Sequence, residues 1–192
     1  EFSVDHGKDP FRLYILIFRR CRKKWLKMNF DKKIIGEIKQ PYFFYKGKFD
    51  KIDSKYFIKK IDEGCALKNN NSFQTNVIGE MTSWNYFNND VEFLKFIWQI
   101  FDEVDKDVDR FKYVLRDAWG IKNGLSHYTK QHGHHGNYFS GILYINKHPQ
   151  VLEFPEINEE LKPEPGSFAF FSSFLRHGCK RNQKDSMKYG IS

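Results

Sequence analysis

The change of hydrophobic period along the chain limits the fold more than any other feature. Across residues 90–109, Leu94, Ile97 and Phe101 recur three or four positions apart, which predicts an amphipathic helix that backs a sheet. Beyond this helix the pattern changes to short apolar runs separated by Pro, Gly and Asn turns. We expect strands at residues 140–146, 151–154, 167–172 and 187–192. Helices first and short strands afterwards predict an α+β fold, a double-stranded β-helix (a cupin-like jelly roll) with flanking helices.

The part of the chain before this helix holds weaker signals. Residues 34–38 and 42–45 are β-prone runs split by Pro41, so both are strand candidates. Asp53 or Ser54 can cap the start of a short helix, and Gly64 is expected to end it.

Length and composition favour a single domain with an appendage. A chain of 192 residues suits one core, and 40% hydrophobic and 18% aromatic residues argue against disorder. A block of basic residues occupies positions 19–27, ahead of the strand region. We therefore expect residues 1–30 to be a basic N-terminal appendage outside the working domain. Residues 31–192 would form the domain, truncated at its C-terminal strand.

Several classes of protein are disfavoured. The three cysteines have no CxxC spacing, which argues against a disulfide framework or a cysteine-ligated zinc. No apolar run approaches the roughly 18 residues of a membrane span, and the basic block follows the apolar stretch at residues 11–18, unlike a secretory signal. We expect a cytoplasmic protein. The net charge of +8 leaves nucleic-acid binding as a minor alternative, since no known recognition motif accompanies it.

The histidines are concentrated in one part of the chain. Six of the seven lie between positions 127 and 177. His132 and His134 flank Gly133, and alternate residues of an extended segment point to the same side, so both rings can address one metal ion. His177 follows a hydrophobic run from which a strand could return it to the same place. Imidazole suits iron, zinc, copper and nickel, so the pattern predicts a metal site.

The stretch from Trp119 to Ser192 resembles a family of 2-oxoglutarate and iron(II)-dependent oxygenases common in phage and marine bacterial genomes. That family shows a Trp, a His-x-His, a Ser-Gly before an aromatic strand, a Pro-x-x-Gly turn, a Phe-rich strand ending in His, and a basic residue entering the last strand. The matching residues are Trp119, His132-Gly133-His134, Ser140-Gly141, Pro163 to Gly166, Phe168 to His177, and Lys188. Thr75 to Val77 and Thr82 to Trp84 extend the likeness to residues 34–192.

The resemblance implies a site and a chemistry. His132, His134 and His177 would be the metal ligands at the catalytic centre, with iron(II), the co-substrate 2-oxoglutarate and dioxygen as reactants. Lys188 stands where the family places the cation, usually Arg, that binds the remote carboxylate of the co-substrate. Arg181 could substitute for Lys188. Tyr144 could donate its hydroxyl to the co-substrate or could equally be a core aromatic residue.

Two departures from the family pattern matter. His134 occupies the position of a carboxylate ligand, which leaves the site one charge more positive, and His135 is a rival for this role. Lys188 keeps the charge of Arg but loses its two-pronged hydrogen bonding.

The prediction is thus a dioxygenase that hydroxylates an unidentified substrate, a small molecule or a protein side chain, with release of succinate and CO2. The alternative is a non-catalytic jelly-roll module that binds a metal or another ligand. The sequence leaves the oligomeric state open.

Overall fold

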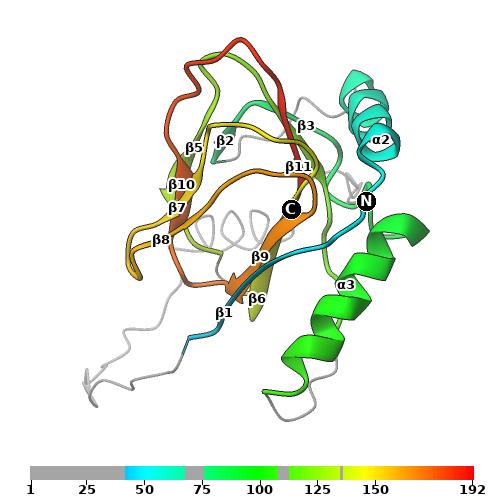
Figure 1. Cartoon of the computed structure of the whole chain (residues 1–192), viewed down its shortest axis with the longest axis vertical. Coiled ribbons are helices and arrows are strands. Elements are labelled where there is room, and N and C mark those ends of the chain that lie inside the picture. The colour runs from blue at the N-terminus through cyan, green and yellow to red at the C-terminus, as the bar shows by residue number, and fades with distance from the viewer. Residues whose placement is uncertain (1–41, 68–75, 108–112, 135) are drawn as a thin grey trace, which may run out of the picture. The chain divides into compact units, whose positions relative to one another are not determined.

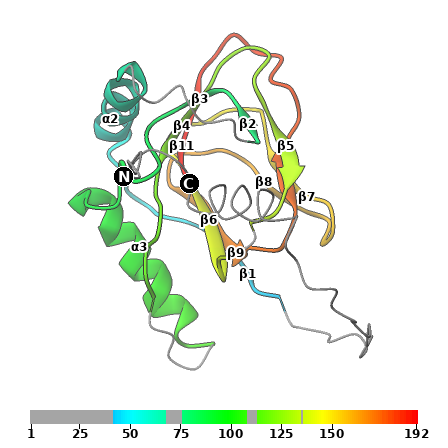
Figure 2. The same ribbon diagram turned by 180° about the vertical axis from the view of Figure 1, so that it is seen from behind.

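The computed structural model describes residues 42–67, 76–107, 113–134 and 136–192, and the segment Pro41–Ser192 forms one compact unit. The predicted strand at residues 34–38 and the predicted boundary at residue 30 lie outside the described residues. The described part consists of two antiparallel sheets and two helices, and both helices lie on the same side of the strands (Figures 1 and 2). The elements are β1 (Phe44–Lys48), α2 (Ser54–Ala66), β2 (Val77–Ile78), β3 (Glu80–Met81), α3 (Val91–Val104), β4 (Gly120–Asn123), β5 (Tyr128–His132), β6 (Phe139–Tyr144), β7 (Leu152–Phe154), β8 (Glu159–Leu161), β9 (Ser167–Ser172), β10 (His177–Cys179) and β11 (Lys188–Ile191).

The chain passes back and forth between the two sheets. The six-stranded sheet has the order β1-β9-β6-β11-β4-β3, and the five-stranded sheet has the order β2-β5-β10-β7-β8. Strands β4 to β7 therefore alternate between the sheets, as do β9 to β11. This alternation pairs β5 with β10, and β4 with β11, although each pair is far apart in the sequence.

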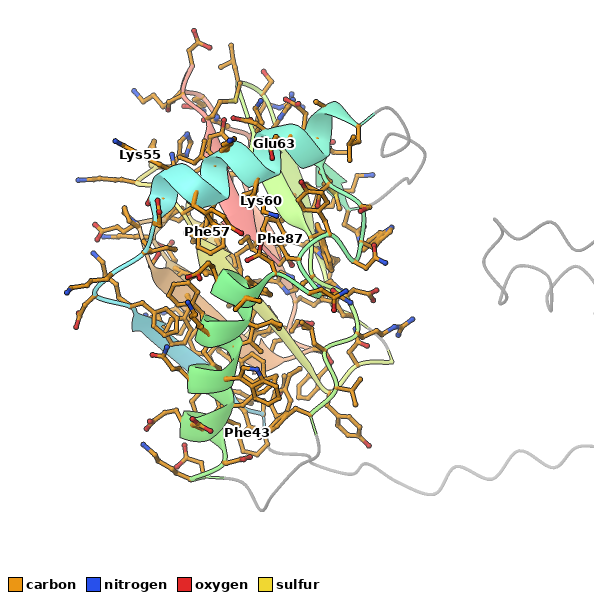
Figure 3. All side chains as sticks on the ribbon, turned by 90° about the vertical axis from the view of Figure 1, so that its right-hand side faces the viewer. Phe43, Lys55, Phe57, Lys60, Glu63 and Phe87 are labelled. Carbon is orange, nitrogen blue, oxygen red and sulfur yellow. The ribbon has the colours of Figure 1, made fainter. Side chains whose placement is uncertain are left out.

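Helix α2 starts at its predicted cap, Asp53, but it runs through Gly64, its predicted stop, to Ala66, because helical residues continue for two positions beyond this glycine. The carboxylate of Asp53 accepts the backbone N–H of Tyr56 at 3.0 Å, which satisfies a donor of the first turn. Figure 3 shows Phe57 and Phe87 next to each other beneath the helix, whereas Lys55 and Glu63 point away from the sheet. The two phenyl rings have centroids 6.2 Å apart, so α2 is held by its apolar face.

Helix α3 is shorter than predicted. It starts where predicted, with Asp90 as its N-cap, but it ends at Val104, and residues 108 and 109 of the predicted span lie outside the described residues. Its buried face also includes residues beyond the predicted stripe. The fully buried members are Phe93, Ile100, Phe101 and Val104.

The strand period of two divides the side chains of the six-stranded sheet between two cores. Leu143 and Ile145 pack against the helices in one apolar cluster. Tyr144, between them, faces the other way and packs with Leu152 and Phe171 between the sheets. Strand β9 spans the predicted range, and β6, β7 and β11 depart from theirs by one or two residues. None of the described helices is long and apolar enough to cross a membrane.

Candidate metal centre and adjoining cavity

Strand pairing brings the three predicted histidines together. His132 ends β5 and lies opposite His177, the first residue of β10. His134 lies two residues beyond β5, where its N–H donates to the carbonyl of Ser173 at 2.7 Å. One ligand atom from each of the three rings lies within 4.8 Å of the others, so the group could hold a metal ion.

Gly133 allows this close approach of the two segments. A Cβ atom at this position would lie 3.0 Å from the carbonyl oxygen of Phe174 and 3.3 Å from that of Ser173. The backbone of a neighbouring turn thus occupies the space that a side chain would need. The His-x-His spacing therefore requires glycine, or a shift of the turn, at its middle position.

In His132 and His177, hydrogen bonds to backbone carbonyls determine which ring nitrogen keeps its lone pair. The Nδ1 of His132 lies 2.7 Å from the carbonyl oxygen of Lys130, and the Nδ1 of His177 lies 2.9 Å from that of Leu175. A carbonyl only accepts, so each Nδ1 must carry the proton and each Nε2 keeps a lone pair. The Nε2 of His177 lies 3.3 Å from that of His134. This carbonyl–histidine arrangement is the support that metal-binding histidines usually have.

Burial favours the neutral form of two of the histidines, His132 and His177. The ring of His177 packs between Phe171 and Phe154, with centroid distances of 4.8 and 5.8 Å. Burial lowers the pKa of His177 to about 3, and it lowers the pKa of His132 against the opposing effect of the hydrogen bond to Lys130. Neutral imidazole is the form that binds metals, so burial favours the metal-binding form of both rings.

A narrow space between the sheets, which we call the inner cavity, adjoins the histidines. Its volume is about 50 Å³. The polar residues that line it besides the three histidines are Trp119, Asn123, Thr129, Ser140, Tyr144, Cys179, Lys188 and Ser192.

Lys188 enters the inner cavity without an anionic partner. It is only 3% exposed, and its Nζ makes two long contacts, 3.3 Å to the Sγ of Cys179 and 3.4 Å to the carbonyl of Gln150. Its ammonium lies 5.4 Å from the centroid of the Tyr144 ring. No carboxylate within the described ranges pairs with it, and burial lowers its pKa. A buried cation of this kind is costly unless an anion compensates it.

Tyr144 lines the same cavity, and Arg181 does not. Tyr144 faces inward with Ser140, as the alternation predicts, and burial raises the pKa of its phenol well above the ordinary value. The guanidinium of Arg181 is exposed, lies 5.0 Å from the ring of Tyr128 and donates to the carbonyl of Ser126. The rival ligand His135 lies outside the described residues.

A second space, which we call the outer cleft, meets the inner cavity beside the histidines. It has a volume of about 740 Å³ and lies between α3, residues 113–119 and the outer face of β6 and β9. Trp119, His134 and Ser140 line both spaces. The indole N–H of Trp119 is buried and has no acceptor among the described residues.

Sequence reasoning missed four polar residues of the inner cavity, which are Asn123, Thr129, Cys179 and Ser192. Cys179 lies two positions after His177 on β10, so strand alternation alone could have identified it. Asn123 lies directly opposite Lys188 in the pairing of β4 with β11, which no local signal reveals. Trp119, which belongs to the family pattern, packs edge-on against Trp84, with ring centroids 4.7 Å apart, and also lines both spaces.

Comparisons with known proteins support the fold. No family model and no curated protein matches the sequence. Among solved structures, the chain is similar to a viral collagen prolyl hydroxylase from Paramecium Bursaria Chlorella virus-1 in complex with 2-oxoglutarate, with a TM-score of 0.56, 15% identity, and coverage of 78% of this chain and 92% of that one. It is also similar to a Pseudomonas putida prolyl-4-hydroxylase, with a TM-score of 0.55, 12% identity, and coverage of 77% and 89%. At such identities the likeness shows a shared fold.

Proposed function

We propose that the chain is a 2-oxoglutarate- and iron(II)-dependent dioxygenase that hydroxylates a substrate, with the two sheets forming a double-stranded β-helix around the site. One observation carries the proposal. Three histidines converge within 4.8 Å at a cavity that also receives a buried lysine without a carboxylate partner in the described part of the chain. The fold shared with two prolyl hydroxylases supports it.

In this proposal His132, His134 and His177 hold iron(II) on one face. Bound iron supplies the redox chemistry that couples decarboxylation of 2-oxoglutarate to oxidation of a C–H bond. The carbonyls of Lys130 and Leu175 hold two of the rings in the tautomer that presents Nε2. Phe154 and Phe171 exclude water from the His177 side of the centre.

Lys188 would bind the remote carboxylate of 2-oxoglutarate, with Tyr144 as a second donor from its phenol. A five-carbon dicarboxylate needs more room than the 50 Å³ of the inner cavity. The Lys188 ammonium therefore has to leave Cys179 and Gln150 and turn toward the ligand. Both contacts are long, at 3.3 and 3.4 Å, and the lysine stem is flexible, so this movement costs little.

The outer cleft is the proposed substrate side, because it reaches His134 from outside the inner cavity. The two structural neighbours act on prolyl residues according to their names. A prolyl side chain is therefore the first protein substrate to test, alongside small-molecule candidates.

The experiment is an anaerobic titration of the purified protein with iron(II) and 2-oxoglutarate, in which the weak visible charge-transfer band of an iron-chelated keto acid is measured. We expect the band in the parent protein and in His127→Ala, since His127 lies outside the cluster. We expect no band in His132→Ala or His177→Ala. Iron binding without the band would favour the non-catalytic module, and absence of metal binding would refute the site.

A further inference from the structure

The inner cavity has an excess of positive charge. No Asp or Glu is among the described residues that line it. The groups that shift the pKa of His132, His177 and Lys188 include no carboxylate. Within the described ranges, Lys188 is the one charged side chain that lines the cavity, and it is a cation.

The acidic side chains on neighbouring segments have other partners. Glu156 accepts the backbone N–H of Arg176 at 2.8 Å, and Glu153 forms an ion pair with Lys180 at 2.6 Å. Neither lines the inner cavity. A carboxylate from these residues would have to break an existing contact to reach the metal centre.

The charges of the loaded site therefore do not sum to zero. A divalent metal ion and the Lys188 ammonium carry three positive charges together, and 2-oxoglutarate brings two negative charges. With a carboxylate in place of His134 the sum would be zero, whereas three imidazoles leave one positive charge. An uncompensated charge in a buried, low-dielectric site is strongly unfavourable, so the site favours one further anion.

Trp119 provides a donor that lines the same two spaces as His134, the inner cavity and the outer cleft. Its indole N–H is buried without an acceptor in the described residues, and an indole nitrogen can only donate. A buried donor left unpaired is unfavourable, and an anion that accepts its hydrogen bond would relieve that cost.

We infer that the three-histidine centre binds a small monoanion together with 2-oxoglutarate, in contact with the Trp119 indole N–H. The inference rests on the proposed function. The anion would lie beside the metal ion that His132, His134 and His177 would hold, where it offsets the remaining positive charge. The anion is either a free halide-sized ion or an anionic group of the substrate.

The test uses the cobalt(II)-substituted protein without oxygen and with saturating 2-oxoglutarate. Azide is titrated as the probe while the visible d–d absorption of cobalt is recorded. We expect a saturable spectral change in the parent protein. His134→Asp, which restores a carboxylate, should weaken azide binding by about tenfold or more, because it removes the charge that attracts the anion. Trp119→Phe, which keeps the packing but removes the N–H, should weaken it by roughly threefold to tenfold.

Parallel titrations distinguish the two sources of the anion. Saturation by chloride would identify a free inorganic ion, and saturation by formate without any response to chloride would identify a substrate carboxylate. An unchanged spectrum with azide, in protein that has bound cobalt and 2-oxoglutarate, would overturn the inference and leave the proposed function intact. Equal azide affinity in the parent, His134→Asp and Trp119→Phe would also overturn it. Failure of the parent to bind cobalt would overturn both. If His134→Asp does not fold, the parent and Trp119→Phe titrations still decide.

Discussion

At the scale of single residues, Lys188 indicates that the inner cavity binds a ligand and is not simply part of the packed core. A buried lysine that served packing would normally have a carboxylate partner, but the Lys188 ammonium has only two long contacts, to a thiol and a carbonyl. Its burial is unfavourable for stability and favourable for binding an anion.

Replacing Lys188 by Ala should therefore weaken 2-oxoglutarate binding without destabilising the fold. A charge-assisted hydrogen bond contributes about 1.5–3 kcal/mol, so we expect affinity to fall by roughly tenfold to a hundredfold. The free energy of unfolding should stay equal or rise. Calorimetric titration and urea unfolding measure the two quantities. Lys180→Ala is the matched control, because Lys180 is exposed and pairs with Glu153. Undiminished affinity in Lys188→Ala would rule out its proposed role.

At the scale of elements, Asp90 joins α2 to α3. Its carboxylate caps α3 by accepting the N–H of Phe93 at 3.0 Å, and it also accepts the hydroxyl of Tyr56 at 2.7 Å. Lys60 lies 3.4 Å from the same carboxylate. One buried side chain thus fixes the start of one helix against the side of the other.

We expect Asp90→Ala to lower the free energy of unfolding by about 2 kcal/mol, since it removes a cap and a hydrogen bond from tyrosine. Asp90→Asn keeps the capping oxygen and should cost less. Metal affinity should be unchanged in both, because Asp90 is not part of the histidine cluster. Thermal unfolding and cobalt titration of the parent, Asp90→Ala and Asp90→Asn test this prediction. Loss of metal binding in Asp90→Asn would show that α3 supports the site more directly than its contacts indicate.

His148 connects the turn after β6 with the loop before β11. Its Nδ1 accepts the N–H of Gln150 at 3.1 Å, so its Nε2 carries the proton and donates to the carbonyl of Ser186 at 3.1 Å. Burial lowers the pKa of His148 below its ordinary value of 6.5, the bond to Ser186 opposes this shift, and the charge of Lys188 adds to it. The ring is therefore a neutral structural link.

This link gives the stability of the fold a pH dependence. As the pH falls below 6.5, the unfolded chain takes up a proton that the folded His148 resists. The free energy of unfolding is therefore highest above this value and declines as the pH approaches the lowered pKa. His148→Asn should show a smaller decline than the parent in urea unfolding between about pH 7 and about pH 5, where histidine titrates. An equal decline of the free energy of unfolding in the parent and in His148→Asn would contradict the assignment of this pH dependence to His148.

At the scale of the whole molecule, the metal centre joins segments that are distant in the chain. His132 ends β5, His134 lies two residues beyond it, and His177 begins β10 in the same sheet. A metal ion that binds all three can do so only in the folded state, so binding should stabilise the fold.

We expect cobalt(II) to raise the midpoint of thermal unfolding. The free energy of unfolding should rise by about 2.7 kcal/mol when the free metal concentration is a hundredfold above its dissociation constant. His177→Ala should lose this gain, and His127→Ala should keep it. Differential scanning calorimetry with and without the metal measures both. An equal gain in His177→Ala would mean that the ion binds elsewhere.

Local patterns predicted much of the fold and the histidine cluster. Caps and turn residues act within a few positions, so the start of α3 at Asp90 and the extent of β9 follow from the sequence. The end of α3 was predicted too late, because the apolar period continues past the point where the helix stops. The convergence of His132, His134 and His177 is confirmed, and metal binding stays a prediction.

The sequence by itself determined which residues could form the site, since alternation sets the face of each side chain within a strand. Only the tertiary structure decided which candidates meet. Lys188 rather than Arg181 lines the inner cavity, and Asn123 joins it from β4. The physical reason is that these contacts depend on pairing between β4 and β11 and on packing of one sheet over the other. Such pairings come from the burial of apolar faces across the whole domain, and no short stretch of sequence encodes them.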